Sequence, residues 1–314
     1  MTQVATNTAW AHGLAGFSPA GDLLDVWYPE PKLGAAPRGD SAWIVSKQLD
    51  ELAGVDSVTG TERKVIRTEI DLSIAVTSTA DAYLRLHLLS HLLIRPNGLN
   101  LDDLIPNLPM LAFTTRGPMR VSDFKSRQQQ LLRQGVALLS LDRFPRLLDY
   151  VVPDRVRIAD AQRVRLGAHL APGTVVMHEG FVNFNAGTLG ESMVEGRISQ
   201  GVVVGPGSDI GGGASIMGTL SGGGKHRVSI GSRCLIGANA GIGVSIGDDC
   251  VIEAGLYLTA GTKLQLISDA GNQQVKASEL SGQSGLLFRR NSLSGAVEAL
   301  PRKAEGVELN PQLH

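Results

Sequence analysis

The sequence has few aromatic residues, few cysteines, no excess of either charge and no long hydrophobic run. Aromatic residues make up 4% of its 314 positions, and 29 lysines and arginines nearly balance 30 aspartates and glutamates. General nucleic-acid-binding proteins usually carry a basic excess, so this class is disfavoured. No apolar stretch approaches the roughly 18 residues of a membrane-spanning helix. The N-terminus MTQVATNTAW also lacks the basic and then apolar layout of a signal peptide. We therefore expect a cytoplasmic protein with no nucleic-acid or membrane partner.

Glycine is the residue in excess. Of the 38 glycines, 23 fall between Val164 and Leu264, a stretch that contains only two prolines. A glycine inside a regular helix or strand costs roughly 0.5–1 kcal/mol relative to alanine, so long helices would not contain so many. The glycines favour a fold in which tight corners recur at short intervals.

The same stretch contains an aliphatic residue at nearly every sixth position, beginning at Val152. The register slips by four residues on the way from Val194 to Val204 and again after Ile242, and it is interrupted before Ile230. A second column of mostly small residues follows four places after the first. The predicted inward positions are Val152, Ile158, Val164, Leu170, Val176, Val182, Thr188, Val194, Val204, Ile210, Ile216, Ile230, Ile236, Ile242, Ile246, Ile252, Leu258 and Leu264.

A period of six matches neither an α-helix nor a single alternating strand, whereas hexapeptide repeats are a signature of β-helices. The fold class predicted is mainly β: a left-handed parallel β-helix of about six triangular coils over residues 151–267. An N-terminal α/β domain over 1–150 and a small C-terminal β cap over 268–314 flank it. Cys234 and Cys250 occupy the small inward column and are expected as buried, inert side chains.

The N-terminal part shows ordinary helix and strand patterns. The alternation in Lys64–Ile74 predicts a strand, and apolar residues at helical spacing predict a helix over Ala80–Ile94. A second helix is expected over Ser122–Arg133, with Ser122 as its N-terminal cap. His87 and His91 lie one turn apart on the first helix; with no obvious third ligand, packing is favoured over metal binding.

Two polar features interrupt the repeat. Gly222–Arg227 lacks the residues of a phosphate-binding P-loop, so it predicts a loop extruded from the coil between positions 218 and 228. Glu195 replaces the small residue after Val194, and Arg197 follows two places later, so both side chains project to one side of an extended segment. Spacing alone fits either a functional carboxylate beside a guanidinium or an ordinary surface ion pair.

The strings VNFNAGTLG, MVEGRIS and LLFRRNS carry a family resemblance. They lie in Phe181–Gly190, Met193–Ser199 and Leu286–Ser292, and the stretch from about residue 145 to 300 strongly resembles the 2,3,4,5-tetrahydropyridine-2,6-dicarboxylate N-succinyltransferase family. This resemblance implies a left-handed β-helix assembled as a homotrimer, with active sites between subunits. It also implies succinyl-CoA as the acyl donor and co-substrate. The acceptor implied is ring-opened tetrahydrodipicolinate, and the products are N-succinyl-2-amino-6-oxopimelate and CoA, on the lysine and diaminopimelate pathway.

The resemblance also assigns residue roles. Glu195 matches the catalytic glutamate, acting either as a nucleophile that forms an acyl anhydride or as a general base. Arg197 matches the residue that binds the succinyl carboxylate, which suits a planar guanidinium. Further positions match those that bind succinyl-CoA: Gly212, Ser215, Ala238, Glu253, Ala254, Gly255, Lys276, Gly285, Leu286, Leu287 and Phe288.

The resemblance implies a divalent metal site, but only one of its two expected carboxylates is present. Glu179 matches one metal-binding carboxylate of the family, but Gln162 stands where the second is expected. A neutral amide binds Mg²⁺ more weakly than a carboxylate does, so the departure argues against a Mg²⁺ requirement, although three copies of Glu179 around a trimer axis would still attract a cation.

Other function classes stay open on the residues alone. A different β-helix acyltransferase would use His178 or His226 as its base on another acceptor, with an acetyl donor. A trimeric β-helix metal hydratase would need histidines such as His169, His178 and His226 to converge from neighbouring subunits. A non-catalytic solenoid would show a regular threonine or charge ladder on its flat faces, and the sequence contains none.

Overall fold

The computed structural model describes residues 7–38, 47–220, 226–268 and 271–302. The chain forms two compact units. Unit 1 comprises Met1–Ile94 and Gly98–Val151, and unit 2 comprises Arg95–Asn97 and Val152–His314. Each unit is built around its own core.

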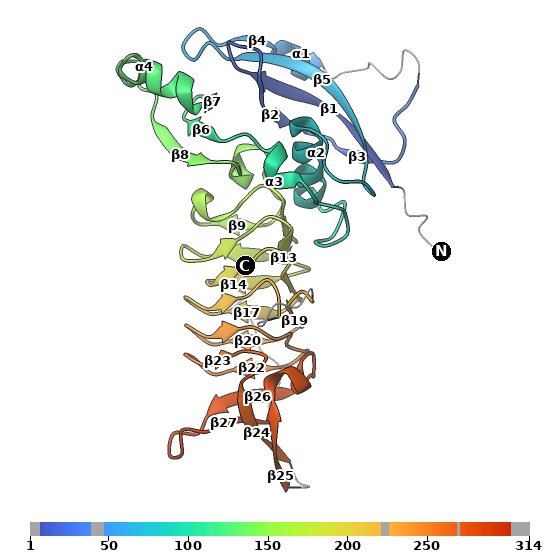
Figure 1. Ribbon diagram of the computed structural model, residues 1–314, viewed down its shortest axis with the longest axis vertical. Coiled ribbons are helices and arrows are strands. Elements are labelled where there is room, and N and C mark those ends of the chain that lie inside the picture. Colours follow the sequence, from blue (N-terminus) through green and yellow to red (C-terminus); the bar gives the residue numbers. More distant parts are fainter. Residues whose placement is uncertain (1–6, 39–46, 221–225, 269–270, 303–314) are drawn as a thin grey trace. The chain divides into compact units, whose positions relative to one another are not determined.

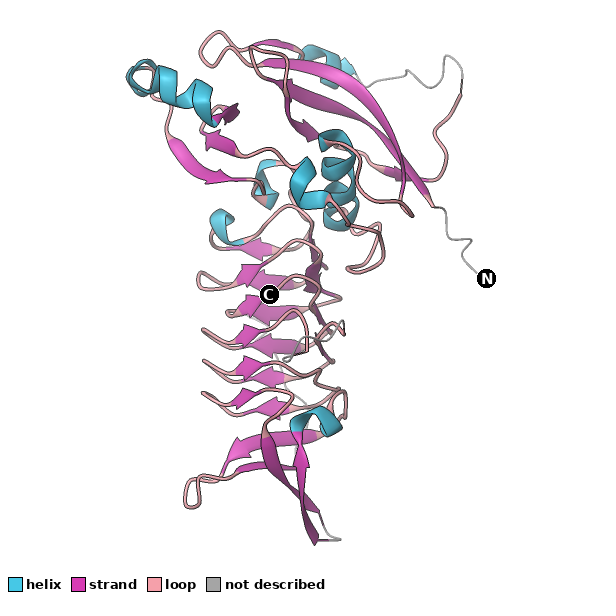
Figure 2. Cartoon of the chain, in the orientation of Figure 1, coloured by secondary structure: helices cyan, strands magenta, loops and turns pink. Residues whose placement is uncertain are grey.

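Unit 2 is a stack of short parallel strands that form three faces (Figures 1 and 2). The first face has the order β10-β13-β16-β19, the second contains β9, β11, β14, β17, β20 and β22, and the third has the order β12-β15-β18-β21-β23. The second face shows six coil levels among the described residues, which confirms the predicted β-helix. The strands of the first face are β10 (Ala168–Leu170), β13 (Ala186–Thr188), β16 (Val203–Val204) and β19 (Ser229–Ile230). Those of the second face are β9 (Arg157–Ile158), β11 (Thr174–Val176), β14 (Ser192–Val194), β17 (Ser208–Ile210), β20 (Leu235–Ile236) and β22 (Val251–Ile252). Those of the third face are β12 (Phe181–Val182), β15 (Arg197–Ile198), β18 (Ser215–Ile216), β21 (Gly241–Ile242) and β23 (Tyr257–Leu258).

The predicted inward column forms the core of the coils, with two exceptions at its start. The residues from Val164 to Leu264 in that column are all buried. Val152 is instead 86% exposed, because the first coil begins only at β9. Ile158 is half-buried because β9 ends its sheet and has a single strand neighbour, β11. Both cysteines are fully buried, as predicted.

Thr188 is the one polar residue of the inward column, and the structure explains it. Its Oγ1 lies 2.6 Å from the Oγ1 of Thr174, which is on β11 of the second face, and accepts a hydrogen bond from Ala171 N at 3.3 Å. Thr174 Oγ1 in turn donates to the Ala171 carbonyl. Both threonines are fully buried, so the pair satisfies its polar groups inside the core.

The C-terminal segment continues the second face of the β-helix. Strand β26 (Leu286–Arg290) pairs in parallel with β22 and antiparallel with β27 (Val297–Pro301). Strands β24 (Lys263–Ser268) and β25 (Gly271–Lys276) form an antiparallel ladder that joins the same sheet through β27. A 3₁₀ turn, η4 (Ala277–Leu280), follows β25. These strands cover the end of the last coil.

Among its described residues, unit 1 combines two antiparallel sheets with four α-helices. The larger sheet has the order β2-β1-β5-β4, with β3 also paired to β1, and the smaller has the order β7-β6-β8. The element bounds are β1 (Thr8–Phe17), β2 (Leu23–Trp27), β3 (Lys32–Leu33), α1 (Lys47–Glu51), β4 (Gly54–Val55), β5 (Glu62–Asp71), α2 (Thr79–Ser90), α3 (Leu104–Asn107), β6 (Leu111–Thr114), β7 (Gly117–Arg120), α4 (Val121–Arg133) and β8 (Leu138–Asp142). Helix α2 packs on β2 and β5 and buries most of its surface there.

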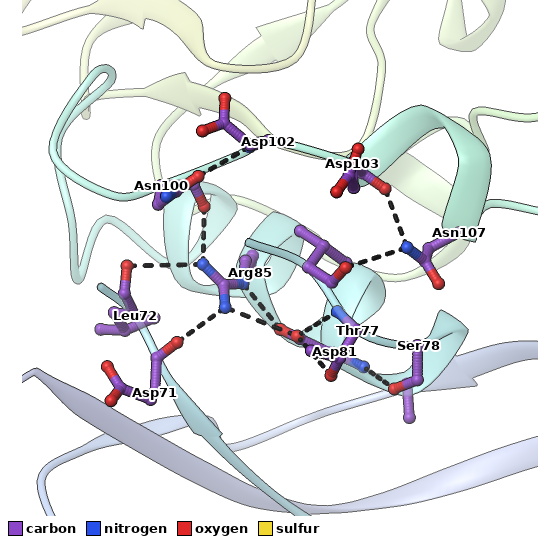
Figure 3. Close-up of polar contacts among 12 residues, drawn as sticks. Asp71, Leu72, Thr77, Ser78, Asp81, Arg85, Asn100, Asp102, Asp103 and Asn107 are labelled. Carbon is purple, nitrogen blue, oxygen red and sulfur yellow. Dashed lines mark hydrogen bonds and ion pairs between the residues drawn. The ribbon is translucent and has the colours of Figure 1, made fainter. Parts of the chain in front are cut away.

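A fully buried arginine fastens α2 to its surroundings (Figure 3). Arg85 Nε donates to Asp81 Oδ1 at 2.6 Å, one helical turn away. Its Nη2 donates to the Asp71 carbonyl at the end of β5, and its Nη1 donates to the Asn100 carbonyl. Asp81 Oδ2 accepts a hydrogen bond from Thr77 N just before the helix. The buried charge therefore holds three backbone segments together.

Both predicted helices are present, but the end of the first and the start of the second differ from the prediction. Helix α2 ends at Ser90 rather than Ile94, with His91 as its C-cap. The expectation that Ser122 caps the second helix was wrong. Helix α4 begins at Val121 after Arg120, and Ser122 lies inside its first turn. Asp123 in that turn accepts two hydrogen bonds from the Arg120 side chain, so an ion pair links the residue before the helix to its first turn, and no described side chain caps the helix start.

Candidate active site

The site assembles at the corner where each coil passes from the second to the third face. Between Val194 and Ile198 this corner contains only three residues, whereas the same corner in the other coils contains five, as between Ile210 and Ile216. This is the four-residue slip seen in the sequence. It places Glu195 and Arg197 on a tighter bend than their equivalents above and below.

Gly196 makes the short bend feasible. A Cβ added to Gly196 would lie 2.5 Å from the Ala214 carbonyl oxygen and 2.9 Å from Ile210 Cγ2, so only glycine fits against the next coil. The flanking backbone groups are fixed by that coil: Glu195 N donates to the Ile210 carbonyl and Arg197 N to the Ala214 carbonyl. The Glu195 and Arg197 side chains therefore extend from a backbone that is held on both sides of Gly196.

The Glu195 side chain lies over Gly212 of the next coil. A Cβ added to Gly212 would lie 3.2 Å from Glu195 Oε2, closer than nine in ten real Cβ contacts. Glu195 is half-buried, so its carboxylate is partly shielded from water but still reachable. A carboxylate in this position can accept a proton or attack an electrophilic carbon.

Arg197 is oriented by a serine on the neighbouring strand. Arg197 and Ser215 are direct partners in the β15–β18 pairing, and Arg197 Nε donates to Ser215 Oγ at 3.0 Å, with Nη2 donating to the same oxygen. The guanidinium is exposed, so its outer edge can bind a carboxylate. Ser215 thus acts on Arg197, a role that the sequence did not reveal.

The same corner continues through the next two coils with small residues. Asn239 N donates to the Gly212 carbonyl, and Gly255 N donates to the Ala238 carbonyl. Gly213, Asn239 and Gly255 have positive φ, the left-handed conformation that favours glycine and asparagine. We call the succession Glu195, Gly212, Ala238 and Ala254 the corner track. These four residues lie on successive coils, so three inter-strand spacings, roughly 14 Å in all, separate the first from the last. Apart from Glu195, their side chains are small.

Glu253 and the C-terminal residues are joined by hydrogen bonds between the last coil and β26. The Glu253 carboxylate accepts a hydrogen bond from Arg290 N, and Glu253 N donates to the Phe288 carbonyl. Glu253 therefore joins the last coil to β26. Leu286 and Phe288 are 7% and 2% exposed, so their side chains fill the core, while Leu287 is half-buried. Gly285 precedes them in a positive-φ turn.

Lys276 lies on a separate element, at the end of β25 opposite Lys263. Its side chain is exposed, and its backbone N–H donates to Glu279 Oε1. Glu253 joins the last coil to β26, whereas Lys276 lies on β25, three strands farther along the same sheet.

Tyr257 was missed by the sequence analysis. It pairs with Gly241, which in turn pairs with Ser215, so the three residues are neighbours on the third face. A Cβ added to Gly241 would lie 2.2 Å from the tyrosine ring, and Tyr257 is 56% exposed. In the sequence, the available signal was Gly241, which stands where the repeat usually has an outward side chain. Tyr257 stands at the same position of the next coil. The ring extends the surface beyond Ser215.

The residues implied as metal ligands do not fit a divalent cation. Glu179 is engaged by Arg163, whose Nη2 lies 3.3 Å from Glu179 Oε2 and donates to the Glu179 carbonyl at 2.8 Å. Gln162 is a neutral amide on the 3₁₀ turn η3 (Ala161–Arg163). Within the described part of the chain, no three histidine, cysteine or acidic side chains gather as a metal site would require.

The histidine candidates are dispersed. His169 is buried in β10, His178 is exposed at a coil corner, and His226 is exposed at the base of the excursion. Positions 222–225 of the predicted Gly222–Arg227 loop lie outside the described residues. At its base Thr219 and Arg227 form an antiparallel bridge, so the chain leaves and re-enters the coil side by side. No helix among the described residues is long and apolar enough to span a membrane.

The chain is similar to known proteins both in sequence and in fold. A family profile described as "Hexapeptide repeat of succinyl-transferase" matches residues 227–260. The chain is 48% identical over 305 residues to the 2,3,4,5-tetrahydropyridine-2,6-dicarboxylate N-succinyltransferase of Vibrio cholerae, covering 96% of this chain and 87% of that protein. It is 48% identical over 300 residues to the enzyme of the same name from Pseudomonas aeruginosa, covering 90% and 87%.

A solved structure from Campylobacter jejuni, described as a putative 2,3,4,5-tetrahydropyridine-2-carboxylate N-succinyltransferase, has a similar fold. The TM-score is 0.81 with 28% sequence identity, and the match covers 95% of this chain and 93% of that one. The architecture of this chain is therefore shared along nearly its full length.

Proposed function

The chain belongs to the 2,3,4,5-tetrahydropyridine-2,6-dicarboxylate N-succinyltransferase family, and we propose that Glu195 and Arg197 carry out its reaction at the corner track. The enzyme is a tetrahydrodipicolinate N-succinyltransferase of diaminopimelate and lysine biosynthesis, with succinyl-CoA as the donor. One observation carries the residue assignment. A half-buried carboxylate and an oriented guanidinium extend from a three-residue bend whose geometry requires Gly196.

Glu195 is the reacting carboxylate, and two balanced routes are available to it. As a base, it takes a proton from the acceptor amine while the amine nitrogen bonds to the thioester carbon, and the CoA thiolate leaves as the tetrahedral intermediate collapses. As a nucleophile, it displaces the CoA thiolate first and forms a mixed anhydride. The amine then attacks that acyl carbon, the Glu195 carboxylate leaves, and the proton lost from the amine nitrogen passes to solvent. Gly212 leaves room for the carboxylate in both routes.

Rapid mixing separates the two routes. Succinyl-CoA is mixed with the enzyme without acceptor, and free thiol is followed over time. The nucleophilic route gives a burst of CoA equal to the number of active sites. The base route gives no burst but full turnover once acceptor is added. Glu195→Gln should reduce turnover by at least about a thousandfold in either route, with the fold intact. Near-normal turnover of that variant would remove Glu195 from the reaction.

Arg197 selects the donor by binding its terminal carboxylate. Its Nε and Nη2 are held by Ser215, which leaves Nη1 for the ligand. A charge-assisted hydrogen bond contributes about 1.5–3 kcal/mol, or roughly a tenfold to hundredfold effect. Arg197→Met should therefore lower kcat/KM for succinyl-CoA by that factor. Its slow reaction with acetyl-CoA, which lacks the carboxylate, should be unchanged, and an equal loss with both donors would contradict the assignment.

The small residues of the corner track suit the extended pantetheine arm of the donor. Gly212, Ala238, Ala254 and Gly255 leave backbone groups accessible along successive coils. Gly285, Leu286, Leu287 and Phe288 would contribute through backbone atoms and the half-buried Leu287, and exposed Lys276 through its charge. Lys276→Met, paired with Lys125→Met on exposed α4 as the control, tests that contribution through KM for the donor.

We also propose a homotrimer with active sites between subunits, in the cytoplasm. The support is the family resemblance together with the open setting of the corner track, since a second subunit against that edge would exclude water from the reacting groups. Light scattering measures the mass directly. A monomer that turns over at full rate would overturn the shared-site proposal.

No step is assigned to Mg²⁺, because Glu179 is paired with Arg163 and Gln162 is neutral. Turnover should therefore be unchanged after extensive chelation. A chelator-sensitive enzyme that is restored by Mg²⁺ would contradict this conclusion.

A further inference from the structure

A cavity of about 430 Å³ lies within unit 1, and none of the residues assigned to succinyl transfer lines it. All of its lining residues belong to unit 1, whereas the corner track belongs to unit 2. Its volume is within the range of small-molecule sites in proteins. The reaction assigned above uses none of its residues.

An ion pair that crosses a strand forms one side of the cavity. Gly16 on β1 pairs with Asp25 on β2 and with Arg63 on β5, so the three residues lie side by side. Arg63 Nη1 donates to Asp25 Oδ1 at 2.7 Å directly over the glycine. A Cβ added to Gly16 would lie 2.3 Å from Asp25 Oδ1 and 2.6 Å from Arg63 Nη1, so any other residue would block this pair.

The pair leaves part of its guanidinium unused. Asp25 is satisfied, because its other oxygen accepts a hydrogen bond from Tyr150 at 2.8 Å and its side chain is 3% exposed. Arg63 Nη1 donates to Asp25, and no described residue accepts a hydrogen bond from Arg63 Nη2. A Cβ added to Gly117, also on the cavity wall, would lie 3.1 Å from that nitrogen, so a second glycine keeps the space beside it open. The spare donors suit a carboxylate.

A second ion pair lines the same cavity. Arg146 Nε and Nη2 donate to the two oxygens of Asp149 at 2.9 and 2.7 Å, across the 3₁₀ turn η2 (Leu147–Asp149). The side chains are 19% and 32% exposed, so both remain partly open. The bidentate pair occupies one lone pair on each carboxylate oxygen and leaves capacity to accept from an ammonium.

The charge balance identifies the class of ligand. Two guanidiniums and two carboxylates make the lining neutral, so a multiply charged anion would gain from the arginines and lose to Asp25 and Asp149. A zwitterion satisfies both signs at once. Thr114 and Thr115 also line the cavity, and the apolar part of the wall, which includes Trp27, Phe113 and Leu139, suits an aliphatic side chain.

We propose that this cavity binds an α-amino acid with an aliphatic side chain. The carboxylate lies on the spare edge of Arg63, the ammonium on Asp149, and the side chain against the apolar wall. The inference does not depend on the proposed function, since it rests on unit 1 alone.

Calorimetric titration of the full-length enzyme with three matched probes tests the recognition. L-norleucine carries both charged groups, hexanoate lacks the ammonium, and pentylamine lacks the carboxylate. We expect one L-norleucine per chain, with a Kd in the millimolar range or tighter, and binding of each deletion analogue at least about tenfold weaker. The absence of saturable binding by L-norleucine, or equal binding by hexanoate or pentylamine, would overturn the proposal.

Variants locate the bound ligand. Asp149→Asn removes the charge that accepts the ammonium and should weaken L-norleucine binding at least about tenfold. Asp154→Asn is the matched control, because Asp154 pairs with Arg155 at the surface and does not line the cavity, so it should bind as the unaltered enzyme does. Glu195→Gln should also bind L-norleucine normally. Loss of binding in Glu195→Gln would place the ligand in the transfer site, and undiminished binding in Asp149→Asn would exclude the cavity. Melting temperatures identify any variant that fails to fold.

Discussion

The carboxylate of Glu195 and the bare Cα of Gly212 face each other across two adjacent coils. A methyl group on Gly212 would lie 3.2 Å from Glu195 Oε2 and 3.3 Å from its carboxyl carbon. The backbone of Gly212 does not adopt a positive φ, so glycine is needed there for space and not for conformation. Gly212 thus determines where the carboxylate of Glu195, the proposed reacting group, can lie.

Gly212→Ala should displace that carboxylate without unfolding the coil. Because misplacement of a reacting group by about 1 Å can cost up to about a hundredfold, we expect kcat to fall by roughly tenfold to a hundredfold. Steady-state kinetics and thermal melting measure the two effects separately. Gly261→Ala is the control, since an added Cβ there meets nothing within 4 Å. Equal kinetics for the two variants would show that the space beside Glu195 is unimportant.

Ile236 tests the inward register of the β-helix. Its side chain is fully buried between Ile210 and Ile252 of the adjacent coils. Ile236→Asp would bury a charge without a partner and should prevent folding of the coil. Ile236→Val removes one methylene and should cost only about 0.5–1.5 kcal/mol in denaturant unfolding. A folded, active Ile236→Asp enzyme would contradict the register.

The repeat made the β-helix predictable because its core is formed by one residue in six. Ile210, Ile236 and Ile252 lie at the same position of successive coils, so a local pattern specifies a long-range contact. Unit 1 has no such repetition. Its sheet order depends on pairings such as Gly16 with Arg63, which no short pattern specifies.

The site was only partly predictable for the same reason. Glu195 and Arg197 were found because they interrupt the repeat, and the four-residue slip marked the tight bend. The role of Ser215 depends on strand pairing with Arg197, and the engagement of Glu253 by Arg290 depends on where the cap returns to the coil. Both are contacts between distant parts of the chain, and both became visible only in the folded structure.

Arg85 should be among the most costly residues to replace in unit 1. Arg85→Met would leave Asp81 buried without its partner and leave the Asp71 and Asn100 carbonyls unbonded. Breaking a buried pair from one side costs about 3–5 kcal/mol. Arg116→Met removes an exposed pair and should cost about 0–1 kcal/mol. Urea unfolding followed by circular dichroism compares the two. Similar losses in both variants would show that burial of Arg85 does not matter.

His87 should make the stability of the enzyme depend on pH. It is fully buried; its Nε2 accepts a hydrogen bond from Tyr28 N, and its Nδ1 donates to the Tyr83 carbonyl. Burial lowers the pKa of His87 from 6.5 to about 3. The folded state therefore keeps the imidazole neutral where the unfolded chain binds a proton. The contribution of neutral His87 to the stability of the folded state is complete above pH 6.5. It is lost as the pH falls toward the pKa of His87 in the folded state.

The expected loss is measurable well before acid unfolding. One group with this shift should reduce the free energy of unfolding by about 2 kcal/mol between about pH 7.5 and about pH 5. His87→Gln has no proton to bind in this range, so that part of the slope should disappear in the variant, even if the variant is less stable overall. Urea unfolding at several pH values gives both curves. Parallel curves for the two proteins would mean that His87 is protonated as easily in the folded enzyme as in the unfolded chain.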